Sequence, residues 1–258
     1  MTEPVATYPD LAGKTAFVTG GSKGIGAATC RLLAANGAKV AVVARGARAV
    51  EELASELRRG GADAVGVTAD CTSGDDIARA RSRTEAELGP VELLVPFAGG
   101  FESFSPVLEL AVDEWRAILE ANLTSTFVTV REFLPGMTER GRGSIVTMSS
   151  ISGRYLDKLT QAAYAAAKAG VVMFTRHLAL EVGAFGVRAN CVAPGTTMSE
   201  RIGRVMTPEA IERTTALSPL GRFGQPEDTA NATLFLLSDA ASWLTGVTLD
   251  VTGGRIML

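Results

Sequence analysis

A tyrosine and a lysine at helical spacing are the residues of this sequence best suited to proton chemistry. Tyr164 and Lys168 lie four residues apart in the alanine-rich stretch AAYAAAKAG, which favours a helix and places both side chains on one face. An ammonium beside a phenol favours the phenolate, so we expect the pKa of the Tyr164 phenol to fall toward the working pH. Such a phenol can donate a proton to a carbonyl oxygen or accept one from an alcohol. Alone, the pair also fits an ordinary surface contact, because many helices carry Tyr and Lys at this spacing.

A glycine-rich segment near the start of the chain has the composition of a phosphate-binding turn. The sequence GGSKGIG follows Thr19, between a predicted strand at 14–19 and a predicted helix from Gly24 to Asn36. Glycine allows a tight turn close to a diphosphate, and the following helix offers free N–H groups and the positive end of its dipole. The position between a strand and a helix therefore predicts a nucleotide-binding turn, whereas a lone glycine cluster would also fit an ordinary tight turn.

Short apolar runs alternate with longer helical stretches along the rest of the chain. Further strands are predicted at 39–44, 64–69, 91–95, 144–149, 187–192 and 247–251. The helices predicted between them lie at 47–59, 73–88, 112–138, 161–184 and 226–238. Several strands are almost continuously apolar, which is typical of a parallel sheet covered on both faces. The alternation predicts one α/β domain over residues 1–258, a doubly wound, mostly parallel seven-stranded sheet with helices on both faces. The irregular stretch at about 195–222 is the predicted substrate lid.

The composition excludes several classes of function. Lysine plus arginine number 25 and aspartate plus glutamate 28, a net charge of −3, so we expect no nucleic-acid partner. Three widely spaced cysteines (Cys30, Cys71 and Cys191) and a single histidine, His177, argue against a disulfide framework, a metal site or a Ser-His-Asp triad. The N-terminus has no signal-peptide pattern, and no stretch approaches the ~18 apolar residues of a membrane span. We therefore expect no membrane partner and a cytoplasmic location.

Together the motifs resemble the classical short-chain dehydrogenases/reductases. That family's two hallmark patterns, Thr-Gly-x-x-x-Gly-x-Gly and Tyr-x-x-x-Lys, occur here at 19–26 and 164–168, in the expected order. The resemblance extends over nearly the whole chain and also includes Asp70, Asn122, Ser149, Ser150, Asn190, Pro194, Gly195 and a Thr-Gly-Gly at 252–254. It implies a Rossmann-like fold and an enzyme that transfers a hydride between a nicotinamide cofactor and a carbonyl or secondary-alcohol carbon of a small-molecule substrate. With the apolar tail at 256–258, it also implies a homotetramer or a homodimer.

The resemblance implies a role for each of the catalytic residues. Tyr164 matches the acid/base, and Lys168 matches the residue that lowers the pKa of the phenol and holds the nicotinamide ribose. Asn122 matches a residue that holds a water in a proton relay. The alternative for Asn122 is a structural hydrogen bond, because a buried amide needs partners.

Of two adjacent serines, the second fits the family pattern. Ser150 lies three residues before Gly153, as Ser-x-x-Gly requires, and so matches the hydroxyl that hydrogen-bonds the substrate oxygen. Ser149 is expected to be a structural strand-end residue, a reading that also remains open for Ser150.

The cofactor site implied by the resemblance combines the glycine-rich turn, the strand ends and the catalytic pair. The expected contacts are Gly20, Ser22, Lys23, Gly24, Ile25, Gly26, Arg45, Asp70, Cys71, Ala98, Gly99, Tyr164, Lys168, Pro194, Gly195 and Thr197. Asp70 matches the residue at the adenine ring. A carboxylate there also fits the N-terminal region of the next helix, for which Thr72 and Ser73 are possible caps.

The charges beside the second strand favour NADP(H) over NAD(H). NAD-specific members usually carry an acidic residue at the end of this strand, where the present chain has Ala44 followed by Arg45. Lys23 in the glycine-rich turn adds a second cation, and a 2′-phosphate would bind both. The alternatives are that both cations are exposed turn residues, and that the protein is an NAD-dependent alcohol dehydrogenase of the same family or a nucleotide-binding module without catalysis.

One segment departs from the family pattern. The usual Asn-Asn-Ala-Gly after the fourth strand is here Pro96-Phe97-Ala98-Gly99. Because proline lacks an N–H donor, we expect the strand to end near Val95 and Phe97 to pack where an amide usually bonds. The departure bears on the rigidity of the floor of the cofactor site.

Apolar residues in the loops near the expected nicotinamide predict an apolar substrate pocket. They are Phe101, Phe104, Tyr155, Leu156, Met198, Ile202 and Met206. Some of them would equally fit the core or a subunit contact. Arg140 and Arg142 precede the fifth strand, but Phe185 stands where a second basic residue would help to hold an acidic carrier protein. This argues against a role in fatty-acid synthesis.

Overall fold

A single sheet of seven parallel strands forms the centre of the protein. The computed structural model describes residues 6–101, 104–156, 160–199 and 206–257. The strands are β1 (Thr15–Thr19), β2 (Lys39–Ala44), β3 (Ala64–Thr68), β4 (Val91–Pro96), β5 (Gly143–Met148), β6 (Val187–Pro194) and β7 (Thr248–Val251). They lie in the order β3-β2-β1-β4-β5-β6-β7, and every pair is parallel. The predicted doubly wound sheet is confirmed, and it is wholly rather than mostly parallel.

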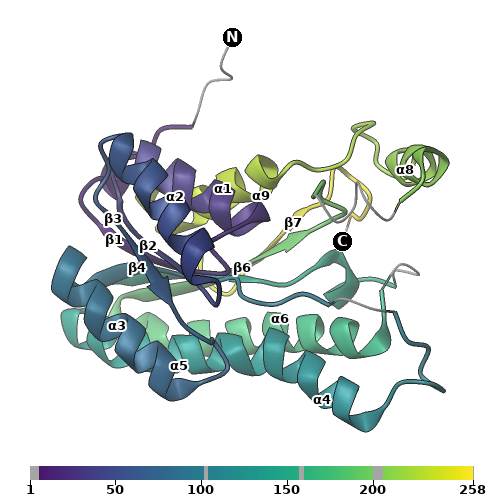
Figure 1. Cartoon of the computed structure of the whole chain (residues 1–258), viewed down its shortest axis with the longest axis horizontal. Coiled ribbons are helices and arrows are strands. Elements are labelled where there is room, and N and C mark those ends of the chain that lie inside the picture. Colours follow the sequence, from purple (N-terminus) through teal and green to yellow (C-terminus); the bar gives the residue numbers. More distant parts are fainter. Residues whose placement is uncertain (1–5, 102–103, 157–159, 200–205, 258) are drawn as a thin grey trace.

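Helices cover both faces of the sheet (Figure 1). The α-helices that the described residues form are α1 (Gly24–Ala35), α2 (Ala47–Arg59), α3 (Gly74–Leu88), α4 (Val112–Leu119), α5 (Ser125–Arg140), α6 (Ala162–Val182), α8 (Pro208–Thr215), which lies away from the sheet, and α9 (Pro226–Leu237). In Figure 1, α1, α2 and α9 form one layer, and α3, α5 and α6 form the other. Each layer encloses its own apolar core, with Leu33, Leu53 and Leu234 in the first and Ile77 and Phe133 in the second. The near-continuous apolar strands follow from this double burial.

The strand order places a switch point at the carboxyl ends of β1 and β4. From β1 the chain proceeds outward through β2 to β3, and then returns to form β4 on the other side of β1. The connections after β1 and after β4 therefore run in opposite directions. In open α/β sheets, the ligand-binding crevice lies at such a switch point. The glycine-rich turn at 20–26 follows β1, and the segment at 97–101 follows β4. Both predicted parts of the cofactor site thus lie at this crevice.

The helix predicted at 112–138 is interrupted in the structure. α4 and α5 are separated by one wide, π-helical turn at Glu120–Thr124, which contains Asn122. Such turns cannot be read from apolar periodicity, because they insert a single residue into an otherwise regular helix. The predicted helical stretch is therefore present, and only its regular α geometry is interrupted, at a predicted catalytic residue.

The fourth strand is one residue longer than predicted. Pro96 is its last residue and pairs with Thr19 of β1. The end near Val95 was expected because proline cannot donate a ladder hydrogen bond. Proline is tolerated here because it closes the strand and the next donor, the Phe97 N–H, turns back to the Val95 carbonyl oxygen at 3.0 Å.

Candidate active site

The Tyr–Lys pair lies on the buried side of α6, where the helix packs against the end of β5. The Nζ atom of Lys168 is 5.6 Å from the centroid of the Tyr164 ring and donates a hydrogen bond of 2.9 Å to the Met148 carbonyl oxygen. Tyr164 is half-buried, whereas Lys168 is only 2 % exposed. Burial lowers the pKa of the Lys168 ammonium to about 8, because the charged form loses its hydration. The pair is therefore no surface contact.

The two serines after β5 make different contacts. The Ser149 hydroxyl donates to the Lys168 carbonyl oxygen at 2.7 Å, and so joins the end of β5 to α6. Ser150 is the N-cap of a short 3-10 turn at Ile151–Gly153, and its hydroxyl oxygen accepts a bond of 3.2 Å from the Ser152 N–H. The same hydroxyl donates a long bond of 3.4 Å to the Ser152 hydroxyl oxygen, and its own oxygen keeps one lone pair for a ligand. Ser149 therefore has a structural contact, as expected, and Ser150 has remaining capacity.

The Ser-x-x-Gly spacing has a packing cause in the structure. A Cβ atom on Gly153 would lie 2.5 Å from the carbonyl carbon of Lys168, a distance at which only glycine fits. The turn that carries Ser150 therefore packs directly against the backbone of Lys168. Two motifs separated along the chain are in this way held in one fixed arrangement.

Asn122 is fully buried in the π-helical turn, and its side chain bonds to backbone groups. Its Oδ1 atom accepts from the Gly100 N–H at 2.7 Å, and its Nδ2 group donates to the carbonyl oxygens of Gly100 at 2.8 Å and Ile118 at 2.9 Å. The amide thus ties the segment after β4 to the helix pair. These are the structural hydrogen bonds considered as the alternative role, and the water-holding role stays a prediction.

The first turn of α1 fits a diphosphate. Lys23 is its N-cap with no side-chain cap, and no acidic residue occurs in the first turn. By contrast, the Ser73 hydroxyl caps α3 by accepting a bond of 3.2 Å from the Asp76 N–H. A Cβ atom on Gly26 would lie 2.2 Å from the Gly20 carbonyl oxygen, so the turn needs glycine there. The uncapped amide groups and the cation are what an anionic ligand requires, and the described residues offer no carboxylate in this turn to repel it.

The residues expected at the adenosine end meet at the carboxyl ends of β2 and β3. Asp70 accepts hydrogen bonds from the Thr72 N–H and hydroxyl at 3.0 and 2.8 Å; these bonds, with a smaller contribution from the Arg45 charge, lower the pKa of its carboxyl group. Burial raises the pKa of the neighbouring Cys71 thiol to about 11. Arg45 and Lys23 are exposed. Asp70 therefore shapes the turn before α3, while its adenine contact stays a prediction.

The floor of the crevice is held together without the family's usual amide. Phe97 is buried in the core beneath α1 and α9, as its apolar ring requires. The Ala98 N–H donates instead to the fully buried Thr19 hydroxyl oxygen at 3.0 Å, which bridges β4 to β1. One buried threonine thus connects two of the strand ends that the cofactor site needs.

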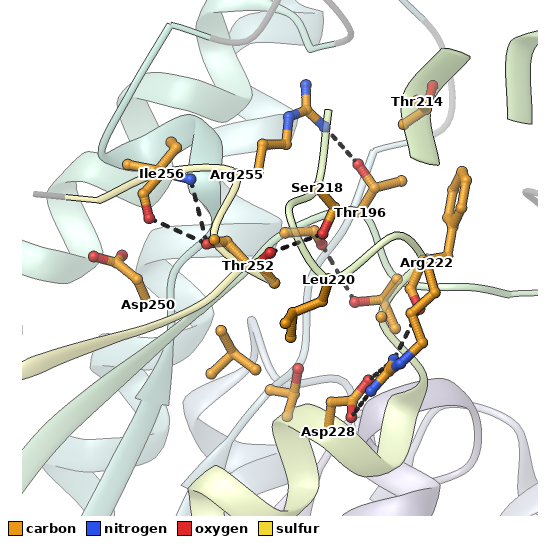
Figure 2. Close-up of a pocket in the computed structure, with 18 residues that line it drawn as sticks. Thr196, Thr214, Ser218, Leu220, Arg222, Asp228, Asp250, Thr252, Arg255 and Ile256 are labelled. Carbon is orange, nitrogen blue, oxygen red and sulfur yellow. Dashed lines mark hydrogen bonds and ion pairs between the residues drawn. The ribbon is translucent and has the colours of Figure 1, made fainter. Parts of the chain in front are cut away.

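A cavity of about 450 Å³ lies beside the end of β6, between the 218–224 turn and the tail after β7 (Figure 2). Gly195 and Thr197, two predicted cofactor residues, line it, but none of the four predicted catalytic residues does. Arg255 reaches back across it to donate to the Thr196 hydroxyl at 2.8 Å. Sequence analysis missed this cavity, because it is bounded by segments whose proximity depends on the last strand.

The apolar residues that were predicted to line the substrate pocket differ in their contacts and exposure. The Phe101 ring stacks on the Tyr164 ring with centroids 4.7 Å apart and a tilt of 51°. Phe104, Tyr155 and Leu156 are exposed, and Met198 and Met206 are half-buried. Ile202 lies outside the described residues. The described part of the predicted lid contains α8 and the first part of the turn at 218–224.

Arg140 and Arg142 lie at the amino-terminal end of the strands, whereas Tyr164 lies near the carboxyl end of β5. Arg140 donates to the Val91 carbonyl oxygen at 2.8 Å, and Arg142 pairs with Glu92 at 2.7 Å, both at the start of β4. These arginines are therefore engaged away from the carboxyl ends of the strands, and the exclusion of a role in fatty-acid synthesis stays a prediction. Among the described residues, no group of three or more His, Cys, Asp and Glu side chains is placed to hold a metal ion. No helix in the described ranges has both the length and the hydropathy needed to cross a bilayer.

The fold and the site define a nucleotide-dependent oxidoreductase, and the chain belongs to the classical short-chain dehydrogenase/reductase family. A family model described as enoyl-(acyl carrier protein) reductase matches residues 20–255. Enzymes of this family act on alcohol and carbonyl groups and use a nicotinamide nucleotide, and this protein is accordingly an enzyme of that class.

Known relatives match the chain over almost its full length. The cis-4-hydroxycyclohexanecarboxylate dehydrogenase of Sinomonas cyclohexanicum is 41 % identical over 247 residues, 95 % of this chain and 97 % of the relative. A 3-oxoacyl-[acyl-carrier-protein] reductase of Vibrio cholerae is 37 % identical and covers 96 % of this chain and 100 % of its own. The crystal structure of a 3-oxoacyl-[acyl-carrier protein] reductase with bound NAD from Brucella melitensis has a TM-score of 0.90 and 33 % identity, over 97 % of this chain and 94 % of that one.

Proposed function

We propose that this enzyme is an NADP(H)-dependent oxidoreductase that interconverts a carbonyl and a secondary alcohol on a small, rather apolar substrate, with Tyr164 as the acid/base. The observation that carries the proposal is the joint placement of three groups. The Lys168 ammonium lies 5.6 Å from the Tyr164 ring, and the Ser150 turn is seated on the Lys168 backbone. A phenol, a cation and a hydroxyl that converge in this way can act on one oxygen atom.

Each residue has a distinct task in this proposal. Tyr164 donates a proton to the carbonyl oxygen in reduction and accepts one from the alcohol in oxidation. Ser150 hydrogen-bonds the same oxygen, while the Lys168 ammonium stabilises the phenolate that remains. The segment held by Asn122 carries a water that returns the proton to solvent. A bound nicotinamide nucleotide would supply or accept the hydride at the substrate carbon.

Replacing Tyr164 by phenylalanine tests the assignment. Tyr164→Phe keeps the ring and deletes the proton, so turnover should fall roughly 10²–10⁴-fold. NADPH binding, followed by fluorescence, should stay within about twofold of wild type, because the phenol is one of many contacts. Tyr8→Phe, at a half-buried tyrosine near the N-terminus, is the matched control. Near-wild-type turnover of Tyr164→Phe would reject the proposal.

The preference for NADP(H) rests on two exposed cations at the adenosine end. Lys23 occupies the N-cap position of α1, and Arg45 lies near enough to Asp70 to lower the pKa of its carboxyl group. Both suit a ribose 2′-phosphate, which takes charge-assisted hydrogen bonds from cations. The rival is an NAD-dependent alcohol dehydrogenase, which the similarity to a reductase solved with bound NAD supports. Side-by-side fluorescence titrations with NADPH and NADH distinguish the two.

The proposed substrate is a free small molecule. Phe101 on the Tyr164 ring and the exposed Phe104 and Leu156 offer apolar contacts near the phenol. The proposed lid at 195–222 would cover such a substrate. Arg140 and Arg142 are engaged at the start of β4, away from Tyr164, which does not favour an acidic carrier protein as the substrate's carrier. A ring alcohol such as that named for the Sinomonas relative is a suitable first probe.

Two exposed apolar faces support a homotetramer. Phe127, Met173 and Leu180 lie on α5 and α6, and Trp243, Leu249 and Met257 lie around β7. Exposed apolar groups of this size usually meet a partner surface, and two separate faces can build four copies, whereas one would build a homodimer. A sedimentation mass equal to one chain would reject both. A cytoplasmic location stays a prediction, and the three cysteines, all buried and unpaired, fit a reducing compartment.

A further inference from the structure

An ion pair attaches the turn that carries Ser150 to the last strand of the sheet. Arg154 directly follows this turn, and its Nη2 group donates to Oδ2 of Asp250 at 2.9 Å, while its Nε atom lies 2.7 Å from Oδ1. Asp250 belongs to β7 and lines the cavity described above; Figure 2 shows it beside Ile256, apart from the Arg222–Asp228 pair. The two partners are separated by 96 residues in the chain.

The pair is sheltered from solvent and contains one charge-assisted hydrogen bond. The side chains of Arg154 and Asp250 are 15 % and 18 % exposed, so both charges have lost most of their hydration. The Nη2 group makes the hydrogen bond, whereas the Nε atom lies close to Oδ1 without hydrogen-bond geometry. Removing one partner would leave the other charge largely buried and uncompensated, a strongly unfavourable arrangement.

The turn between Ser150 and Arg154 is short and rigid. The Gly153 N–H donates to the Ser150 carbonyl oxygen at 3.0 Å, and the N–H groups of Arg154 and Tyr155 donate to the Ile151 carbonyl oxygen at 3.0 and 2.8 Å. These backbone bonds couple the position of Arg154 to that of Ser150. Gly153 on the Lys168 backbone holds the turn from the α6 side, and Asp250 holds it from the β7 side.

The contact is not needed to hold β7 in the sheet. β7 pairs with β6 along its whole length, from Cys191 opposite Thr248 to Pro194 opposite Val251. None of the proposed catalytic residues lies on β7. Of the two segments that the ion pair joins, the Ser150 turn is therefore the one whose position depends on it.

We infer that Arg154 and Asp250 form a positioning pair, which holds the Ser150 hydroxyl at the oxygen that Tyr164 protonates. The inference rests on the proposed role of Ser150 as a hydrogen-bond donor to the substrate oxygen. Arg154 and Asp250 do not themselves touch the reacting atoms. A displacement of about 1 Å in such a contact can lower turnover a hundredfold, so a sheltered anchor at the end of the turn has a direct kinetic effect.

Asp250→Asn is the primary test, because it keeps the shape of the side chain and removes its charge. We expect hydrogen–deuterium exchange in the full-length protein to become faster in peptides covering 150–156, and to stay unchanged in the glycine-rich turn. We also expect kcat to fall roughly tenfold, with the NADPH Kd within about twofold of wild type. The assay substrate is the most rapidly reduced member of a panel of cyclic and aliphatic ketones. Asp250→Glu, which keeps the charge, should retain more of kcat than Asp250→Asn.

Glu92→Gln is the matched control. It breaks the ion pair with Arg142, which has the same 2.7 Å distance and a comparably sheltered carboxylate, 14 % exposed, near the start of the central strand β4. Its kcat and its exchange at 150–156 should match wild type. A loss of kcat in Glu92→Gln equal to that in Asp250→Asn would show a general effect of losing an ion pair and would overturn the inference.

Other outcomes decide the question as well. Unchanged exchange at 150–156 in Asp250→Asn, or a parallel loss of kcat and NADPH affinity, would overturn the positioning role. If circular dichroism shows that Asp250→Asn is unfolded, Arg154→Lys replaces it: reduced kcat with intact NADPH affinity supports the inference, and wild-type kcat overturns it. A fully active Tyr164→Phe would instead reject the proposed chemistry, whatever the behaviour of Asp250→Asn.

Discussion

Gly153 lies so close to Lys168 that a Cβ atom on it would approach the lysine carbonyl carbon to 2.5 Å. The contact joins the turn after β5 to the middle of α6, and therefore joins Ser150 to the Tyr164–Lys168 pair. The Ser149 hydroxyl, which donates to the Lys168 carbonyl oxygen at 2.7 Å, closes the same joint. The relative position of a hydroxyl, a phenol and an ammonium is thus decided by backbone packing.

Gly153→Ala should disturb this joint. The added methyl group must displace the turn or α6, at a cost of about 1–3 kcal/mol in the free energy of unfolding, and kcat should fall with it. Gly183→Ala at the end of α6 is the control, because its added Cβ would meet nothing within 4 Å and its backbone is helical. Urea unfolding and steady-state kinetics measure the two effects. Equal stability and activity of the two variants would contradict the packing argument.

Lys168→Met should separate activity from stability. Burial lowers the pKa of Lys168 from 10.5 to about 8, so the folded protein binds this proton more weakly than the unfolded chain. Below pH 8 both states are protonated, and the buried charge costs about 3 kcal/mol of stability; between pH 8 and 10.5 that cost disappears. The free energy of unfolding of the wild-type protein should therefore rise relative to that of Lys168→Met as the pH increases from 8 to 10.5.

The Lys168→Met variant should be inactive yet no less stable than wild type at pH 7. Removing the buried charge raises the free energy of unfolding, and the loss of the hydrogen bond to the Met148 carbonyl oxygen offsets part of that increase. Urea unfolding at pH 7 and pH 9.5 measures the difference. Lys39→Met, which removes a bond to the Leu88 carbonyl oxygen, controls for the loss of a lysine hydrogen bond. A stability difference independent of pH would contradict the burial argument.

Arg45→Ala should change the cofactor preference. If Arg45 binds a 2′-phosphate, its removal raises the NADPH Kd about tenfold, because a charge-assisted hydrogen bond is lost, and leaves the NADH Kd within about twofold. Arg48→Ala, one position into α2 and paired with Glu52, is the control. Fluorescence titration with both nucleotides gives the four constants. An equal change in the Kd of NADPH and of NADH would mean that Arg45 does not bind the 2′-phosphate.

Asn122→Ala should cost stability as well as activity. It leaves the Gly100 N–H and the carbonyl oxygens of Gly100 and Ile118 without their partner inside the fold, a loss of about 3 kcal/mol. Asn231→Ala, at an exposed position of α9, should be neutral. Thermal unfolding and turnover are the measurements. Wild-type stability with lost turnover would show instead that the amide acts chiefly in the proton relay.

The element order and the positions of the glycine-rich turn and the Tyr–Lys pair could be predicted from the sequence. Strands such as 39–44 and helices such as 47–59 were predicted to the residue, because apolar runs and helical periodicity are local properties. The π-helical turn around Asn122 and the inclusion of Pro96 in β4 were not, because both depend on a single residue and its neighbours in space. Whether Tyr164 and Lys168 form a surface or a buried pair also lay beyond the local pattern.

The sequence by itself determined a doubly wound α/β enzyme with a nucleotide-binding turn and a phenol–ammonium pair, because the spacing of a few residue types along the chain expresses these features directly. Only the tertiary structure decided how the parts meet. It seats Gly153 on Lys168, lets Thr19 bridge to Ala98 where Phe97 replaces an amide, and brings Arg154 to Asp250. The physical reason is that β7 comes last in the chain and lies beside β6 in the sheet. Its residues are therefore close to the Ser150 turn in the assembled sheet, although they are far from it along the chain.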